Sequence, residues 1–241
     1  MPPILEDLHR IVEVFLTLRD DFSFEVTFMQ KRNRKIFILI VAVFLMGAVT
    51  FSVRFLKLFP SGGLRIAGLV GLNLLNGTVA LVALRLSGLK LRLECRNWRQ
   101  YAVGVALAMI LSLCIAVIPS FLGLYLVGEG TALSPKELLY DFFFYLLVIG
   151  PVEELMFRVY LQELFIEFLP RRKWLGVVLA SLLFGLYHWI NGNLMQVIFT
   201  FGIGPYFGFA KYKLKNCGYT AVALGHGLYD FLNTVVRMFV I

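Results

Sequence analysis

The stretch GPVEELMFRVY, residues 150–160, places two adjacent carboxylates and an arginine inside a run of residues that is otherwise apolar. A charged side chain at the centre of a bilayer costs roughly 2.5–3.5 kcal/mol on insertion scales, so this stretch needs pairing, hydration or a function that requires the charges. Glu154 and Arg158 are four residues apart, in the order that favours an ion pair on a helix. Glu153 points about 100° away from that pair and needs another explanation.

The rest of the chain has the composition of a membrane protein. Hydrophobic residues make up 59% of the sequence and charged residues 16%, against about 45–50% and 25% in soluble domains. The formal net charge of +8 comes from Lys and Arg in short clusters between apolar runs, as topology signals do. We therefore expect membrane lipid and no nucleic acid as a partner. Cys95, Cys114 and Cys217 show no paired spacing, so neither a disulfide framework nor a thiolate zinc site is expected.

Apolar runs of the length that crosses a bilayer predict an all-α fold, a polytopic bundle of about seven transmembrane helices. The expected spans are Ile36–Phe55, Ile66–Leu86, Tyr101–Val127, Leu138–Leu169, Trp174–Ile190, Leu194–Ala210 and Tyr219–Ile241. In the fourth, Pro151 cannot donate to the carbonyl of Leu147, which predicts a break at Gly150-Pro151. Before the first span, Ile4, Leu8, Ile11, Phe15 and Leu18 recur at helical spacing and predict an amphipathic helix that lies at the interface or docks on the bundle.

Basic clusters predict the orientation, because Lys and Arg near span ends are retained in the cytoplasm. The clusters precede the first span and follow the second, fourth and sixth. We expect a cytoplasmic N-terminus, a C-terminus on the opposite side and, from the compact size, a prokaryotic plasma membrane. Ser134, Pro135 and Glu137 predict a capped helix start near Leu138.

Two of the three histidines lie inside apolar spans, in FGLYHW (His188) and GHGLYDF (His226). At about 1.5 Å per residue, these histidines, Glu153 and Asp230 all lie about 17–24 Å from the basic ends of their spans. Asp230 is one turn beyond His226, on the same helix face. The shared depth predicts that the four side chains meet around one cavity, although a lone His in a span is more often a hydrogen-bonding packing residue.

A carboxylate and an imidazole at one depth can take a proton from water and pass it to a leaving amine, as peptide hydrolysis requires. His226 and Asp230 could stabilise an oxyanion or hold a metal. The sequence has neither a recognisable nucleophile motif nor H-E-x-x-H, which makes an acyl-enzyme improbable. Two histidines and two carboxylates could nevertheless hold zinc, so Glu153, His188, His226 and Asp230 are also the candidate metal ligands.

These motifs resemble those of the CPBP intramembrane proteases, which include the type II CAAX prenyl endopeptidases and bacteriocin-processing or immunity-linked relatives. The family pattern is E-E-x-x-x-R on one span, F-x-x-x-H on a later one, and H-x-x-x-N, or a similar polar residue in place of the Asn, on another. Here Glu153-Glu154 with Arg158, Phe184 with His188, and His226 with Asp230 match it in order and spacing. The resemblance covers roughly residues 138–236 and makes residues 138–241 the CPBP-like catalytic core, after a cytoplasmic segment 1–35 and transmembrane helices in 36–137.

The resemblance implies a membrane-embedded endopeptidase that acts on a membrane-anchored, possibly prenylated CAAX-type, peptide or protein. Glu153 and His188 would activate water, His226 and residue 230 would stabilise the oxyanion, and Glu154, Arg158 and Phe184 would support them. No cofactor is firmly expected, and zinc stays possible. Asp230 departs from the family's Asn, and an ionised Asp cannot donate to an oxyanion. It could instead orient His226, stay protonated or favour a metal.

Two other functions stay open from the sequence. A catalytically inactive relative could serve as a membrane immunity or scaffold protein, and buried charges also mark the ion paths of proton-coupled transporters. The absence of an evident inverted repeat counts against a transporter. Asn73 and Asn76 in the second span could bond between helices or line the cavity, and packing is the expected role.

Overall fold

A computed structural model describes residues 29–239 of the chain, except 59–61, 125, 127–129, 131 and 193. The amphipathic helix predicted before the first span therefore lies outside the described residues. The chain forms two compact units, Met1–Val41 and Ala42–Ile241. The first helix, Met29–Leu56, begins in one unit and ends in the other.

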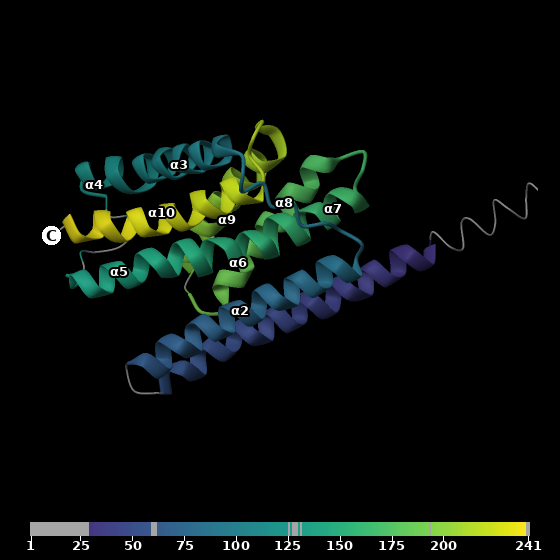
Figure 1. The fold of residues 1–241 in the computed structure, drawn as a ribbon, viewed down its shortest axis with the longest axis horizontal. Helices are drawn as coiled ribbons and strands as arrows, with labels where there is room; N and C mark the ends of the chain where they lie inside the picture. Colours follow the sequence, from purple (N-terminus) through teal and green to yellow (C-terminus); the bar gives the residue numbers. More distant parts are fainter. Residues whose placement is uncertain are drawn as a thin grey trace, which may run out of the picture. The chain divides into compact units, whose positions relative to one another are not determined.

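The part of the chain that the structure describes consists of helices and contains no strand (Figure 1). After the first helix and its 3₁₀ end η1 (Val53–Leu58), the elements are α2 (Gly63–Leu86), α3 (Trp98–Ser112), η2 (Leu113–Val117), α4 (Ile118–Phe121), α5 (Pro135–Phe144), η3 (Tyr145–Ile149), α6 (Gly150–Glu154), η4 (Leu155–Leu161), α7 (Gln162–Phe168), α8 (Lys173–Trp189), α9 (Leu194–Lys213) and α10 (Tyr219–Phe239). Each of the seven predicted segments is helical, which confirms the all-α class.

Among the described residues, three helices are long and apolar enough to cross a membrane: Met29–Leu56, Gly63–Leu86 and Trp98–Phe121. The third ends at Phe121, six residues before its predicted end at Val127. That the other four segments also cross the bilayer stays a prediction.

The sequence predicts a break at Gly150-Pro151, and this prediction is wrong, because the helix around the charged stretch continues through both residues. It runs without interruption from Pro135 to Phe168, and two π-helical segments, η3 and η4, flank the short α-helical turn α6. Pro151 has no N–H to donate to a carbonyl in the preceding turn. That turn, η3, is π-helical: each carbonyl pairs with the N–H five residues later, as Tyr145 does with Gly150. The start of this helix is as predicted: Ser134 and Glu137 form a capping box, and Pro135 lies in the first turn.

Helix α10 lies between α3 on one side and α5, η3 and α6 on the other (Figure 1). Glycines permit the close approach on both sides. A Cβ atom at Gly150 would lie 2.5 Å from the carbonyl oxygen of Ala223, and one at Gly104 would lie 2.6 Å from that of Ala221. These contacts bring the backbone of α6, which carries the two glutamates, directly against the helix that carries His226.

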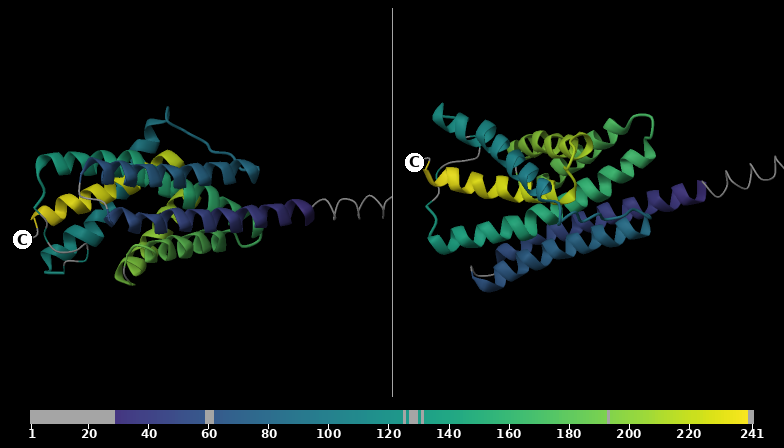
Figure 2. Two further views of the ribbon diagram at one scale, coloured as in Figure 1. Left: turned by 90° about the horizontal axis from the view of Figure 1, so that it is seen from below. Right: turned by 45° about the horizontal axis from the view of Figure 1, so that its top comes forward.

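The remaining helices of this unit pack around the same helix that contains α6. Helices α8 and α9 form an antiparallel hairpin that the two views of Figure 2 show from other sides. The hairpin closes at Gly204, where a Cβ atom would lie 2.9 Å from Cβ of Ser181. Helix α2 packs against η4 and α6. The helices that carry Glu153, His188 and His226 therefore pack against helices from distant parts of the chain.

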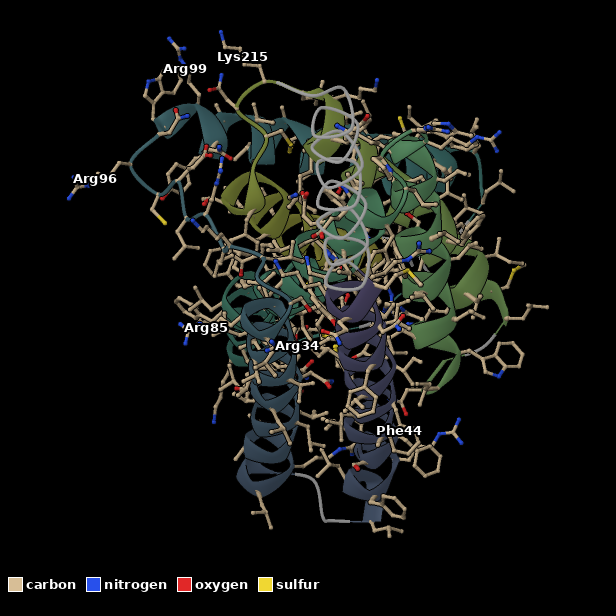
Figure 3. All side chains as sticks on the ribbon, turned by 90° about the vertical axis from the view of Figure 1, so that its right-hand side faces the viewer. Arg34, Phe44, Arg85, Arg96, Arg99 and Lys215 are labelled. Carbon is tan, nitrogen blue, oxygen red and sulfur yellow. The ribbon has the colours of Figure 1, made fainter. Side chains whose placement is uncertain are left out.

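The basic connections after α2 and α9 lie next to each other. Arg96, Arg99 and Lys215 point outward at the same end of this unit (Figure 3), and Asn97 donates from Nδ2 to Oδ1 of Asn216 at 3.2 Å. Two basic clusters therefore share one side of the bundle, as the predicted orientation requires. Which side of the membrane that is stays a prediction.

Candidate active site

Glu153 lies where α6, α8 and α10 meet. Its side chain is buried, with 7% of the residue exposed. One carboxylate oxygen, Oε1, is 3.9 Å from Nε2 of His188, and the other, Oε2, is 3.7 Å from Nε2 of His226. The carboxylate that the sequence leaves unpaired is therefore shared by both histidines.

The partners of the other ring nitrogens set which nitrogen of each imidazole carries its proton. Nδ1 of His188 lies 2.9 Å from the backbone oxygen of Phe184, and a carbonyl can only accept, so this nitrogen donates. Nδ1 of His226 likewise lies 2.8 Å from Oε1 of Glu154. In the neutral form of each ring, Nε2 then presents a lone pair toward Glu153.

Glu154 joins this site to the buried arginine. Its second oxygen, Oε2, is 3.3 Å from Nε of Arg158, and both residues are fully buried. The guanidinium carbon of Arg158 lies 4.6 Å from the centre of the Phe184 ring, a distance typical of a cation–π contact. The arginine thus places a positive charge behind Glu154, and Phe184 contacts both the arginine and the two histidine rings.

Asp230 lies one turn from His226 on α10. Its Oδ2 atom is 3.6 Å from Nε2 of His226, which is too long for a direct hydrogen bond. A small movement of either side chain would bring Asp230 into bonding distance. The same ring nitrogen therefore faces Glu153 and Asp230, and Phe207 stacks on the His226 ring at 5.4 Å between centroids.

These side chains open into a cavity of about 850 Å³. Its walls come from η2, α5, η3, α6, α8, α9 and α10. Helix α10 contributes a polar face, in which His226, Asp230, Thr234 and Arg237 recur at helical spacing, while Phe144, Ile149, Phe199 and Ile203 form apolar parts of the wall. A site with charged groups at one wall and apolar surface at the others can take a peptide from the lipid phase.

The four candidate ligands do not fit a metal ion as they are placed. Within the described residues, no group of three or more His, Cys, Asp or Glu side chains is arranged to hold one. The ligand atoms of Glu153, His188, His226 and Asp230 are 3.6–3.9 Å apart in the pairs that approach each other, against about 3.4 Å for a tetrahedral zinc site with bonds near 2.05 Å.

The structure thus brings together all four side chains that shared depth selected, and it adds one contact that the sequence did not indicate. We expected Glu154 to serve Arg158, yet it also accepts the hydrogen bond from His226. The two residues are 72 positions apart, and no spacing pattern relates them. The only hint in the sequence is that a Glu in an apolar span needs compensating partners, and this does not identify His226.

A known protein family matches the part of the chain that carries the candidate site. Residues 135–232 match the family model described as type II CAAX prenyl endopeptidase Rce1-like. The matched segment begins at the first residue of α5 and contains Glu153, His188, His226 and Asp230. Searches of curated proteins and of solved structures found no match.

Proposed function

From the premise that residues 135–232 belong to the Rce1-like family of type II CAAX prenyl endopeptidases, a family of CPBP proteases, we propose that this chain is an intramembrane endopeptidase. It hydrolyses a peptide bond of a membrane-anchored substrate by activating water with Glu153 and His188. The observation that carries the proposal is the shared position of Glu153 between the Nε2 atoms of two histidines, at the wall of a cavity.

The 3.9 Å between Oε1 of Glu153 and Nε2 of His188 is too long for a direct bond and leaves a place for one water about 2.8 Å from both atoms. Glu153 takes a proton from this water, and the oxygen attacks the carbonyl carbon of the scissile bond. The proton then passes to the amine nitrogen as the carbon–nitrogen bond breaks, either from Glu153 or through His188. The products are a carboxylate and an amine, so no other reactant is consumed.

The tetrahedral intermediate carries a negative charge on the former carbonyl oxygen, which needs a donor. With a second proton on Nε2, His226 donates to that oxygen while Glu154 holds Nδ1 at 2.8 Å. Arg158 faces the other oxygen of Glu154 at 3.3 Å and helps to hold this carboxylate in place. Asp230 faces the same nitrogen and either orients the ring or, when protonated, donates to the oxyanion itself.

The test uses the full chain, reconstituted in liposomes with membrane-anchored peptides, prenylated and non-prenylated, and identifies the products by mass. We expect cleavage that Glu153→Gln or His188→Gln lowers by at least about 100-fold. Glu163→Gln is the matched control, because Glu163 lies on the same long helix but pairs with Lys211, away from the site. A chelator should leave the cleavage unchanged if water is activated without metal.

The outcomes separate the alternatives. Folded protein that cleaves none of the peptides, together with a partner-dependent phenotype that survives Glu153→Gln, contradicts the protease and supports a scaffold or immunity protein. Loss of cleavage in chelator, with recovery on added zinc, contradicts the metal-free mechanism alone. A requirement for the prenyl group would identify the substrate as CAAX-type.

A further inference from the structure

Two adjacent residues of α2, Asn76 and Gly77, contact the chain immediately before each of the water-activating residues. Nδ2 of Asn76 donates to the hydroxyl of Tyr187 at 3.0 Å, and Tyr187 precedes His188. Gly77 faces Val152, which precedes Glu153; a Cβ atom at position 77 would lie 3.2 Å from Cγ2 of Val152. Helix α2 lies outside the segment that matches the family.

The hydrogen bonds of Asn76 form a buried network that fixes the end of α8. Asn76 is 2% exposed, and its amide also donates to Oγ1 of Thr50 at 3.0 Å. Just past α8, Nδ2 of Asn191 donates to the backbone oxygen of Thr50 at 2.8 Å. Two bonds, on either side of His188, thus tie the last turn of α8 to helices earlier in the chain. In an apolar bundle these bonds have few competitors, because lipid offers no donors or acceptors.

The second contact of α2, between Gly77 and Val152, depends on close packing. Gly77 is buried, and the atoms nearest to a Cβ at this position belong to Val152, a core residue that is 6% exposed. A tightly packed core transmits small displacements, because it has few voids to absorb them. The distance from α2 to Val152 therefore fixes where Glu153 lies, just as the bond to Tyr187 fixes where His188 lies.

We infer that Asn76 and Gly77 are positioning residues that set the separation of Glu153 and His188, and with it the place of the attacking water. The inference rests on the proposed function for its consequence in catalysis. The structural part, that α2 sets the 3.9 Å separation of Glu153 and His188, does not depend on the proposed function. It assigns a role to a helix that carries no protease motif and lies before the matched segment.

The first experiment removes the hydrogen bond from both ends. Asn76→Leu and Tyr187→Phe should each lower kcat by about tenfold to a hundredfold, because misplacement of reacting groups by about 1 Å has effects of that size, while KM stays within about twofold. The double variant should be no slower than Asn76→Leu alone, because the bond that Tyr187→Phe removes is already absent in Asn76→Leu. Asn73→Leu is the control: Asn73 lies on the same helix and bonds only its own Leu69 carbonyl, at 2.9 Å.

The second experiment adds a methyl group at the other contact. Gly77→Ala should lower kcat in the same range, and Val152→Ala in the same chain should restore most of it by removing the atoms that the methyl group meets. Gly71→Ala, at a position of α2 where a Cβ atom has nothing within 4 Å, should have no effect. Full activity in Gly77→Ala, or no recovery in the double variant, would overturn the assignment to Gly77.

A readout without activity keeps this inference separate from the proposed function. The chain has three histidines, so His188→Gln and His226→Gln assign the ring resonances of ¹⁵N-histidine-labelled protein in detergent. We expect the His188 ring resonances to shift in Asn76→Leu and Gly77→Ala, and to stay in place in Asn73→Leu and Gly71→Ala. Unchanged resonances contradict the positioning role, even in an active enzyme. Absent cleavage by the wild type contradicts the proposed function alone.

Discussion

At the scale of single residues, Glu154 connects the two kinds of buried charge in this protein. One oxygen accepts from His226 at 2.8 Å, and the other faces Arg158 at 3.3 Å. Within the described residues, neither terminal nitrogen of Arg158 has a hydrogen-bond partner. The carboxylate is therefore the main compensation for a guanidinium buried in an apolar core, and it also fixes the proton of the histidine.

Neutralising this carboxylate should destabilise the fold. Removing one partner of a buried ion pair costs about 3–5 kcal/mol, because the other charge stays buried without compensation. We expect Glu154→Gln to lower the melting temperature of the detergent-solubilised protein. Adding Arg158→Met should recover part of the loss, since the uncompensated charge is then gone. A double variant that is less stable than Glu154→Gln would show that Arg158 stabilises the fold by contacts other than this pair.

Asp230 allows a sharper test of how the oxyanion is stabilised. Asp230→Asn keeps the shape of the side chain and supplies an amide that can donate. We expect this variant to keep cleavage within about tenfold of the wild type, and Asp230→Leu to lose roughly a hundredfold, the usual effect of removing one oxyanion donor. The measurement is kcat on the same anchored peptide. Equal losses in both variants would instead indicate that the negative charge of Asp230 is needed, as it is if Asp230 orients His226.

At the scale of helices, the start of α5 carries a contact whose strength depends on pH. Ser134 donates to Glu137 from both its backbone nitrogen and its hydroxyl, and these bonds lower the pKa of Glu137 from its ordinary value of 4.5. A carboxylate whose pKa is lower in the folded state stabilises the fold above its unfolded pKa, and the contribution is lost as the pH falls through the lowered value.

Ser134→Ala removes the bond from the hydroxyl and keeps the one from the backbone nitrogen. It therefore removes part of this contribution, and its melting temperature should lie below that of the wild type at neutral pH. The gap should shrink as the pH falls below about 4.5, because the protonated Glu137 no longer gains from the cap. Ser52→Ala is the control, since that hydroxyl bonds only the Ala48 carbonyl of its own helix. A gap that is independent of pH between 3 and 7 would show that the carboxylate takes no part in the cap.

The helices were predictable from the sequence because apolar runs and capping residues are local signals. Depth along those helices was also predictable, and it selected Glu153, His188, His226 and Asp230. The rotation of each helix was not. The π-helical segments on both sides of α6 turn the faces of Glu154 and Arg158 relative to a regular α-helix, and no residue pattern marks them. The contact between Glu154 and His226, and that between Asn76 and Tyr187, depend on such rotations and on packing between distant segments.

At the scale of the whole molecule, the charges form an exposed group that is mainly basic and a buried group made of the site carboxylates and Arg158. Basic residues gather in the connections after α2 and α9, at one end of the described bundle (Figure 3). The carboxylates of the site lie inside, where helices meet. Charges at the end need only water or lipid phosphate as partners, whereas those inside need one another. This separation makes the orientation in the membrane testable without activity.

Cys95 lies in the exposed, basic connection after α2, and the helix Trp98–Phe121 separates it from Ala132 at the opposite end. If Lys and Arg mark the cytoplasmic side, a membrane-impermeant maleimide should label Cys95 in inside-out vesicles and leave it unlabelled in right-side-out vesicles. The test uses a chain in which Cys114 and Cys217 are replaced by Ala. A chain whose only cysteine comes from Ala132→Cys should show the reverse pattern. Labelling of both positions from the same side would contradict the span between them. Labelling of Cys95 only from outside would invert the predicted orientation, since the described residues before Cys95 contain two helices long and apolar enough to cross the membrane.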